Sequence, residues 1–481
     1  MDVANKPLSL KLRVLHFIRL VAATVGRFFI SLYYGTEGEK IPPIADDILK
    51  LPAVVVAKKI RNKEITSVEV LEACIRRIKD VNSALNFFVD NRFKSALKEA
   101  QDADALIRGG TKFPDELELE KPFLGVPFTT KDCIAVKGLH HTAGIVRRKD
   151  LIAEKDADAV KLMRESGAII IGITNVPEVC MWWETHNHIY GRSKNPYNTT
   201  RIVGGSSGGE GCCQAVAGSI FGIGVGPMTR YAVDLKPILK IISANNASKL
   251  NLDKPVDIRN IKFFYQHSSG SPIVDQVDKE ITAAMKRVIE HIKTEHKIDA
   301  VEKNIALLQK SMPIWFGAMK NKKKFGEFIL QKESIPNIFK ELFKNLIGLS
   351  GNTFIALFTA LFDHGGVEHG TEKHKHYLEL RDNLEKIFSD MLGDNGVLLY
   401  PTHPTAAPYH NEPLLRPLNF SYTAIINCLG LPATTIPLGL NSEGLPIGLQ
   451  VIANHNQDRL CLAVAEELDR AFGGWIEPQK V

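Results

Sequence analysis

The chain has 481 residues, of which 44% are hydrophobic and 24% are charged, an ordinary composition for a globular protein. Its formal net charge of +6 is small and dispersed, unlike the basic footprint of a nucleic-acid-binding protein, so we expect no nucleic-acid partner. The seven cysteines are scattered and form no Cys-x-x-Cys pair, which favours reduced thiols on the cytosolic side of any membrane. Length alone predicts two to four domains or a single large α/β unit.

Residues 12–34 form an apolar segment near the N-terminus, about long enough to span a bilayer but interrupted by Arg19 and Arg27. On a helix, most of the basic and polar residues gather on one side of this segment. We predict that residues 1–36 anchor the chain to an intracellular membrane, with the basic face toward the lipid headgroups. A helix that crosses the bilayer and a buried amphipathic helix are the alternatives. A signal peptide is disfavoured because no small-residue cleavage site follows.

Residues 41–481 have the pattern of a soluble α/β domain. Thr66 and Glu69 have the spacing of a capping box, which predicts the start of a helix with one apolar face. Further along, residues 157–165 are predicted to be a helix and residues 168–173 an apolar strand. Such an α–β step is typical of a mostly parallel sheet.

A short β segment is predicted over residues 123–132, and it delivers Lys131 at its end. Most lysines are exposed and only solubilise the surface. At the end of an apolar strand, however, a partly desolvated ammonium loses its proton more easily and can act as a base. Downstream, Cys180 and Met181 begin an apolar cluster that ends at Trp183. This cluster suits either a pocket for an apolar substrate or the protein core.

Residues 204–211 place two adjacent hydroxyl groups, those of Ser206 and Ser207, between two glycine pairs. Glycine lets the backbone adopt torsions closed to other residues and approach a ligand closely. A helix-like apolar run over residues 212–223 follows, so the loop would present backbone N–H groups at the N-terminus of a helix. The alternative is a flexible Gly/Ser linker, but linkers rarely lead into an apolar helix.

The order of these motifs resembles that of the amidase signature family. The matching stretches are Gly125-Val-Pro-x-x-x-Lys131-Asp132, Gly172-x-Thr-Asn175-x-Pro177-Glu178, Asn195-Pro196, Gly204-Gly-Ser-Ser-Gly-Gly209, Tyr400-Pro-Thr-His-Pro-Thr, Gly430-Leu-Pro-Ala and Gly444-Leu-Pro-Ile-Gly-Leu-Gln450. The resemblance covers roughly residues 45–475. It implies an α/β fold in which helices cover both faces of a mostly parallel, mixed sheet. Residues 178–183 and the N-terminal apolar segment are similar to the branch that hydrolyses fatty-acid amides, whereas the soluble amidotransferase branch lacks such a segment.

The resemblance also implies a Lys–Ser–Ser triad. In this family a neutral lysine takes a proton, through a bridging serine that follows a cis peptide bond, from a second serine that attacks the amide carbonyl. Lys131 matches the lysine, and Ser206, the first serine of its pair, matches the bridging serine. Cys180, Met181 and Ser206 are the expected substrate-binding residues. We expect neither a cofactor nor a metal.

The family motif that carries the nucleophile, Asp-x-Gly-Gly-Ser-x-Arg, is missing. Gly224 leads directly into residues 226–235, which resemble a motif normally found further along, and Arg230 stands where the nucleophile is expected. An internal deletion at Gly224/Val225 is the simplest explanation. Ser219 is the nearby substitute, but it lies inside the apolar run. Loss of the nucleophile alone in a serine triad costs about 10⁶ in kcat, so we expect an inactive chain.

Four histidines precede a helix predicted over residues 377–392, and their spacings fit metal ligands on one helix face poorly. They are His364, His369, His374 and His376.

The apolar stretch over residues 335–362 is broken by Gly348 and Gly351, which predicts a helical hairpin. In the fatty-acid amide branch such a hairpin docks on the membrane beside the substrate entrance. Packing into the core is the alternative.

The sequence therefore predicts an amidase-signature domain over residues 41–481, incomplete around residues 224 and 225. The resemblance implies a domain that hydrolyses lipid amides taken from a membrane, but this chain is expected to be inactive as given. The alternatives are a non-catalytic binder of lipid amides, a partner of an intact paralogue, and a misassembled chain that folds poorly. The expected partners are a lipid amide and a membrane, and a homodimer is left open.

Overall fold

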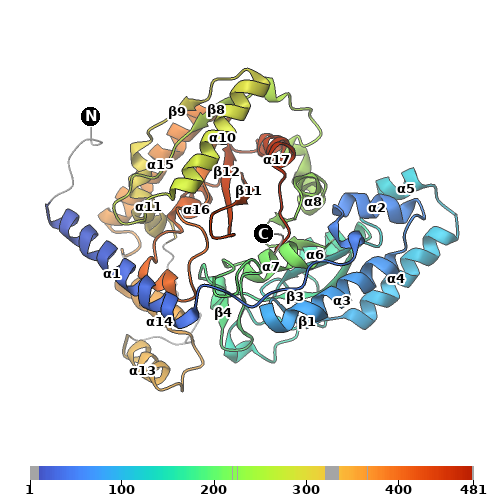
Figure 1. Cartoon of the computed structure of the whole chain (residues 1–481), viewed down its shortest axis with the longest axis horizontal. Helices are drawn as coiled ribbons and strands as arrows, with labels where there is room; N and C mark the ends of the chain where they lie inside the picture. The colour runs from blue at the N-terminus through green and yellow to red at the C-terminus, as the bar shows by residue number, and fades with distance from the viewer. Residues whose placement is uncertain (1–9, 219, 225, 320–334, 366, 479–481) are drawn as a thin grey trace. The chain divides into compact units, whose positions relative to one another are not determined.

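The computed structural model describes residues 10–218, 220–224, 226–319, 335–365 and 367–478 (Figure 1). By its internal contacts the chain divides into two compact units that interleave along the sequence. The first unit comprises residues 1–36, 248–324 and 363–474, and the second comprises residues 37–247, 325–362 and 475–481. Each unit contains a five-stranded sheet, so the predicted α/β class is confirmed.

The sheet of the second unit has the strand order β1-β3-β2-β6-β7. Its strands are β1 (Phe88–Asn91), β2 (Pro127–Lys131), β3 (Ile169–Thr174), β6 (Phe221–Ile223) and β7 (Pro227–Met228). The central strand β2 runs parallel to both β3 and β6, whereas β1 and β7 pair antiparallel at the edges. Every residue of β2, β3 and β6 is buried. Such uninterrupted burial is typical of parallel strands covered on both faces.

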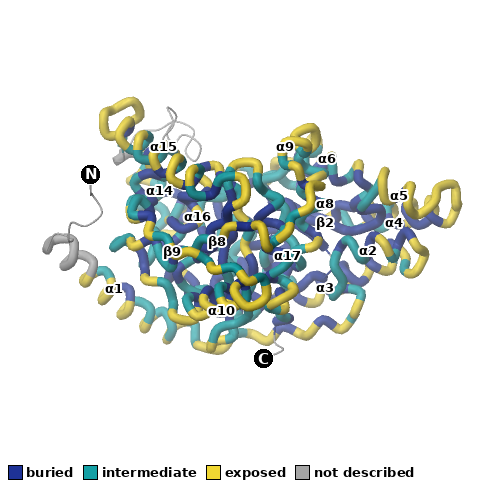
Figure 2. The backbone as a smooth tube through the Cα atoms, turned by 90° about the horizontal axis from the view of Figure 1, so that it is seen from above, coloured by how far each residue is buried: buried dark blue, intermediate teal, exposed yellow. Residues whose placement is uncertain are grey.

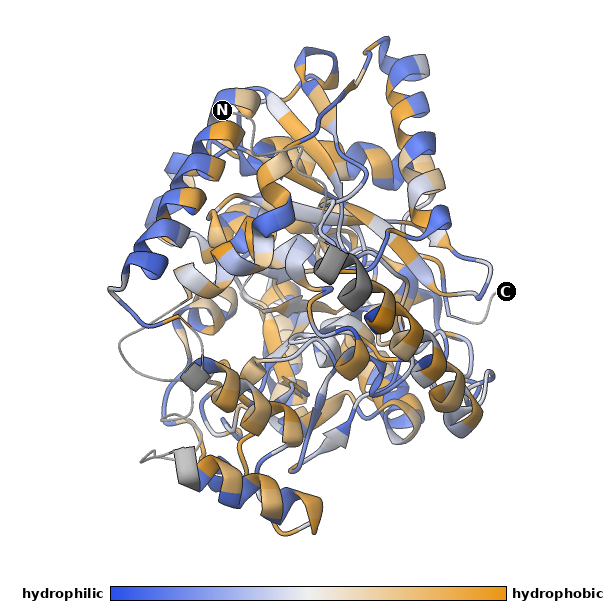
Figure 3. Ribbon diagram, turned by 90° about the vertical axis from the view of Figure 1, so that its left-hand side faces the viewer, coloured by the Kyte–Doolittle hydropathy of each residue, from blue (hydrophilic) through white to orange (hydrophobic). Residues whose placement is uncertain are grey.

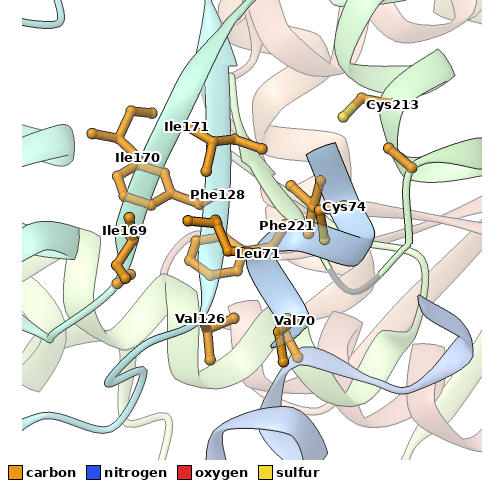
Figure 4. Packing of buried hydrophobic residues seen from close by; sticks show 14 of the residues in the cluster. Val70, Leu71, Cys74, Val126, Phe128, Ile169, Ile170, Ile171, Cys213 and Phe221 are labelled. Carbon is orange, nitrogen blue, oxygen red and sulfur yellow. The ribbon is translucent and has the colours of Figure 1, made fainter. Parts of the chain in front are cut away.

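Helices pack on this sheet through apolar side chains. The helices of the second unit include α2 (Ala53–Arg61), α3 (Ser67–Leu85), α4 (Phe93–Arg108), α5 (Pro114–Glu120), α6 (Asp158–Glu165), α7 (Gly208–Val216) and α8 (Leu235–Ile242). Figure 4 shows Leu71 of α3 beside Phe128 of β2 and Phe221 of β6, whose rings stack with centroids 5.4 Å apart. Burying one such side chain is worth roughly 1.5–3 kcal/mol.

The predicted capping box at the start of α3 is present. The Glu69 backbone N–H donates to Thr66 Oγ1 at 3.1 Å, and the Thr66 backbone N–H donates to Glu69 Oε2 at 2.7 Å. Two backbone donors that a helix start leaves without partners are thereby satisfied.

The prediction of a continuous helix over residues 212–223 is wrong. Helix α7 ends at Val216, Gly218 adopts a positive φ of 101°, and β6 begins at Phe221. A short apolar run suits a buried strand as well as a buried helix, so periodicity alone did not separate the two. Ser219, the candidate substitute nucleophile, lies outside the described residues.

The sheet of the first unit has the strand order β11-β12-β10-β8-β9. Its strands are β8 (Lys262–Tyr265), β9 (Val301–Glu302), β10 (Gly396–Pro401), β11 (Ala433–Leu440) and β12 (Pro446–Ala453), and its helices include α1 (Leu10–Tyr34), α10 (Lys279–His296), α11 (Ser311–Ala318), α15 (Glu372–Leu392), α16 (Ser421–Cys428) and α17 (Asp458–Phe472). The β10 strand pairs parallel with β8 and antiparallel with β12. The hydrophobic core of the first unit includes Tyr400 and Tyr422, whose ring centroids lie 5.1 Å apart.

Helix α1 confirms the helix predicted over residues 12–34, but it faces the other way from the prediction. Arg19 Nη1 lies 2.9 Å from Asp275 Oδ1, and Arg27 lies 3.7 Å from Glu412 and 3.5 Å from Glu443. The basic face therefore contacts carboxylates of the first unit instead of facing headgroups. An amphipathic pattern shows that a helix has two faces, but it does not say which face meets protein.

The outward face of α1 is apolar. Phe28 is 58% exposed and Leu32 is 66% exposed, and Figure 2 marks exposed residues along the helix. Among the described residues, Phe17–Tyr34 is the one segment long and apolar enough to cross a membrane.

The helical hairpin predicted over residues 335–362 is confirmed as α13 (Ile335–Leu346) and α14 (Phe354–Gly365). One side packs inward through a small cluster that includes Ile338 and Leu357. Large apolar side chains remain exposed on both helices and on the turn between them. Figure 3 shows the chain coloured by the hydropathy of its residues. The exposed residues are Phe339, Phe343, Leu346, Ile347, Leu349, Phe354, Phe358 and Phe362.

Candidate active site

The two predicted triad residues meet in the second unit. Lys131 is the last residue of β2 and is 2% exposed, and Ser206 lies in the loop that precedes α7. Lys131 Nζ donates a hydrogen bond of 3.0 Å to Ser206 Oγ, and the Gly205–Ser206 peptide bond is cis. The strand thus carries an amine into the interior, where a hydroxyl group is held within proton-transfer distance.

Glycine is required in this loop because other backbone lies very close. A Cβ on Gly205 would lie 2.5 Å from the carbonyl oxygen of Trp182, and a Cβ on Gly209 would collide with the backbone of Asn175. The Gly209 N–H donates to the Asn175 carbonyl at 3.1 Å, which fixes the start of α7 against the end of β3. Two of the motifs found in the sequence therefore form one packed turn.

Asp132, which follows the lysine, is fully buried. Its carboxylate accepts hydrogen bonds from the Thr142 N–H at 2.9 Å, from the Thr142 hydroxyl group, and from the Gly144 N–H at 3.3 Å. Burial nevertheless raises the pKa of Asp132 above its ordinary value. The carboxylate folds the 132–144 loop back onto the end of β2 and thereby positions the backbone beside Lys131.

Glu210 is a second buried carboxyl group, on the first turn of α7. The hydroxyl groups of Thr129 on β2 and Thr174 on β3 donate to it at 2.8 Å and 2.9 Å. Burial raises its pKa to about 7, although these hydroxyl donors act in the opposite direction. The sequence motif contains Asp132 and Glu210, but nothing in their spacing indicated these internal contacts.

The two further substrate-binding candidates lie on the loop after β3. The Cys180 and Cys133 thiols lie close enough to influence each other electrostatically, and Lys131 acts on both. Interaction with Cys180, with help from the Lys131 charge, holds the pKa of Cys133 below its ordinary value against the effect of burial. Met181 is half-buried on the same loop. Cys180 thus lies near the Lys131–Ser206 pair, whereas no side-chain contact connects Met181 with it among the contacts described.

The same loop is fastened to the hairpin through Glu178. Its Oε2 accepts a hydrogen bond of 2.6 Å from the Thr353 N–H, immediately before α14. Glu178 is buried, and burial raises its pKa to about 7. This contact ties the candidate substrate-binding loop to an apolar hairpin of the same unit.

The junction at Gly224 lies directly beside the candidate site. A Cβ on Gly224 would lie 3.3 Å from Ser207 Oγ and 3.6 Å from Lys131 Cδ. The Gly224 N–H donates to the Gly226 carbonyl at 2.9 Å, so the chain turns tightly here and returns as β7. A segment inserted at this point would therefore emerge next to Lys131 and the serine pair.

Arg230, which follows the junction, is a buried structural residue. Its guanidinium donates to the carbonyl oxygens of Gln214 at 2.9 Å and Leu49 at 2.7 Å, and it lies 4.0 Å from the ring centroid of Trp475. Asp234 caps α2 through the N–H groups of Ala53 and Val54 at 3.0 Å and 2.9 Å. These residues after the junction thus help to hold the second unit together.

Comparison with known proteins identifies the fold to which these features belong. The family model described as Amidase matches residues 69–225 and 224–462. The chain belongs to the amidase signature family. Fatty-acid amide hydrolase 2-A of Danio rerio is 39% identical, with 92% of each chain covered. Fatty-acid amide hydrolase 2 of Homo sapiens is 36% identical, with 98% of each chain covered.

Solved structures agree on the fold. A structure titled "Fatty acid amide hydrolase" has a TM-score of 0.69 and 20% sequence identity, and the likeness covers 89% of this chain and 86% of that one. A structure titled "Crystal structure of amidase" has a TM-score of 0.70. The chain is an amidase-signature hydrolase by family, related to fatty-acid amide hydrolase 2.

The lengths of these alignments indicate that this chain lacks residues that its relatives have. The alignment with the human relative spans 526 positions, whereas 98% of this chain is about 471 residues, so about 55 positions are gaps in this chain. The zebrafish alignment spans 493 positions against about 443 residues, 92% of this chain, which leaves about 50. The family model is also interrupted, and its two matches meet at residues 224 and 225.

Proposed function

We propose that this chain derives from a hydrolase of fatty-acid amides and that, as given, it cannot hydrolyse them because the segment with the nucleophilic serine is absent. In an intact member, the nucleophile would pass its proton through Ser206 to Lys131 and attack the amide carbonyl. The lysine–serine half of this relay has the geometry for proton transfer, with 3.0 Å between Nζ and Oγ. The other half, a serine with backbone N–H donors for the oxyanion, has no counterpart in the sequence.

One observation carries this proposal. The interruption of the family match falls at residues 224 and 225, and Gly224 lies beside both Ser207 and Lys131. A deletion at a random position in the chain would rarely fall beside Lys131 and the serine pair. Apolar amides are the favoured substrate class because the relatives with 36–39% identity carry that activity in their names.

The test is covalent labelling with a serine-directed fluorophosphonate. This chain is compared with a version that carries the missing segment of the human relative between Gly224 and Val225. We expect labelling of the restored chain alone, and its loss when the inserted nucleophilic serine is changed to alanine. Restored Ser206→Ala serves as the control for the relay, with slowed labelling.

Two outcomes would overturn the proposal. Labelling of the unmodified chain, with turnover of an oleoyl amide, would mean that it retains a working nucleophile. A folded restored chain that is never labelled would mean that the missing segment is not the cause of inactivity. If the unmodified chain binds oleoyl amides tightly without turnover, the alternative of a non-catalytic binder applies.

We also propose that α1 holds the protein on a membrane by lying in its plane. The arginines on its inner face are paired with Asp275, Glu412 and Glu443 of the same unit, and its outer face is apolar. A helix crossing the bilayer would carry Arg19 and Arg27 into hydrocarbon, at about 2.5–3.5 kcal/mol each on insertion scales. Lying flat keeps both ion pairs and still buries the apolar face.

A further inference from the structure

Three potential metal ligands converge in the first unit, and none of them is among the four histidines that the sequence singled out. His291 Nε2 lies 3.1 Å from Glu467 Oε1, and His296 Nε2 lies 2.8 Å from the same oxygen. All three ligand atoms lie within 4.8 Å of one another. From these residues we propose a site for a divalent transition metal, Zn²⁺ above all, that joins α10 to α17.

The donor set has the chemistry of a zinc site. Two imidazole nitrogens and one carboxylate oxygen are ligands that Zn²⁺ takes in proteins, at about 2.0–2.2 Å. In a tetrahedral site with such bonds, neighbouring ligand atoms are separated by about 3.4 Å. The two histidine–carboxylate distances of 3.1 Å and 2.8 Å lie within about 0.6 Å of that spacing, and the remaining separation, within 4.8 Å, would have to shorten by up to about 1.4 Å. Three protein ligands leave the fourth position to water or to an exogenous ligand.

The surroundings fix two of the three ligands. Arg470 Nη2 donates to Glu467 Oε2 at 2.7 Å, which leaves Oε1 directed at the histidines. The ring of His291 packs edge-on against Phe472, with centroids 5.5 Å apart. A hydrogen-bonding partner such as Arg470 orients the ligating carboxylate in established metal sites.

The local electrostatics favour a cation at this point. His296 is the last residue of α10, so the site lies at the negative end of the helix dipole. Asp257 is near enough to interact electrostatically with His296. Arg470 contributes an opposing charge, but it is mostly exposed and bound to the other carboxylate oxygen.

The exposure of the cluster is suited to a site that can exchange metal. The side chains of His291, His296 and Glu467 are 20%, 17% and 16% exposed, respectively. An ion could enter from solvent and would then be largely enclosed. Its binding would fasten the C-terminal end of α10 to α17 and stabilise the first unit.

The experiment is a Zn²⁺ titration of the tag-free full chain in detergent, followed by calorimetry and by the melting temperature. We expect one equivalent of Zn²⁺ to bind and to raise the melting temperature, and Co²⁺ to give a visible absorption band at the same site. Loss of an outer partner alone typically costs about 10–100-fold in metal affinity, so His291→Ala and His296→Ala should each cost at least that.

His455→Ala is the matched control, because His455 Nε2 lies 3.1 Å from Glu385 Oε1 without a second imidazole in that pair. It should leave the affinity unchanged. Each variant is compared with its own metal-free melting temperature, and Glu467→Gln preserves side-chain size if an alanine variant fails to fold. Equal Zn²⁺ binding by the control and the three site variants, or no stoichiometric binding by the unmodified chain, would overturn the proposal.

Discussion

At the scale of single residues, Glu210 makes the stability of the second unit depend on pH. Burial raises its folded pKa to about 7 from the model-compound value of 4.5, so between these values the folded state keeps a proton that the unfolded state has released. The contribution of Glu210 to stability is therefore largest below this window and falls by about 3 kcal/mol as the pH rises through it. Glu178, with a pKa of about 7, adds a loss in the same direction.

We accordingly predict that Glu210→Gln flattens the pH dependence, because a neutral amide needs no proton to remain buried. The free energy of unfolding is measured in urea at pH 5 and at pH 8. Over this range, that of the variant should rise relative to that of the unmodified chain by about 3 kcal/mol, the amount given by the shift in pKa. Glu72→Gln, at an exposed position of α3, is the control and should leave the dependence unchanged. If Glu210→Gln and the unmodified chain lose stability in parallel, Glu210 is ionised throughout.

The pairing of Lys131 with Ser206 was predictable from the sequence although 75 residues separate them. Motif order alone indicated it, since each residue occupies the position of a known partner in the resembling family. The contacts that hold the pair in place were not predictable. The position of Glu210 between two threonines depends on strand register, which leaves no local pattern in the sequence.

At the scale of elements, the structure indicates how α1 meets a membrane. We predict that changing Phe28, Phe29 and Leu32 to serine releases the chain from vesicles of neutral phospholipid in a sedimentation assay. The reason is the loss of exposed apolar area that burial in the bilayer stabilises at about 25 cal/mol per Å². Deleting residues 1–36 also removes the other exposed apolar side chains of α1, so it should release the chain at least as completely as the triple variant.

The matched control for this prediction is Arg27→Gln on the inner face. It breaks ion pairs with Glu412 and Glu443 but leaves the apolar face intact, so vesicle binding should persist. The opposite pattern, release by Arg27→Gln and none by the triple variant, would mean that the basic face meets the headgroups after all. If both variants still bind vesicles as the unmodified chain does, the chain attaches to the membrane through another region. The exposed hairpin α13–α14 is then the next region to alter.

Element boundaries were predictable where side chains mark them. Thr66 and Glu69 indicated the start of α3, and the glycines between the two helices of the hairpin indicated where the first helix ends. The prediction failed for residues 212–223, where a helix and a strand are both apolar and buried. It failed also for the orientation of α1, because the partners of Arg19 and Arg27 are carboxylates more than 250 residues away.

At the scale of the whole molecule, the family and the α/β class followed from the ordered motifs, whereas the interleaving of two units did not. Residues 325–362 and 475–481 belong with the second unit although segments of the first unit separate them from it in sequence. A deletion at residues 224 and 225 could remove a central strand of the sheet or the helix that follows it. Yet β6 pairs with β2 on one side and with β7 on the other, so the sheet remains continuous up to its edge.

That edge is short, and this leads to a prediction about the two units. After the junction at residues 224 and 225, β7 pairs with Gly222 and Ile223, so a two-residue strand covers the outer side of β6. Restoring the segment from the human relative should extend the cover of β6 and slow hydrogen exchange of amides in β2 and β6. The amides of β10 and β12 belong to the first unit and should exchange as before, since local stability differs between cooperative units. Tenfold slower exchange corresponds to about 1.4 kcal/mol in the free energy of opening.

A Gly/Ser loop of equal length inserted at the same place is the control, and it should not slow exchange because it adds no apolar or paired surface. Equal slowing in both sheets would mean that the two units open together, and no slowing in β6 would mean that β7 already supports it as well as the missing segment does.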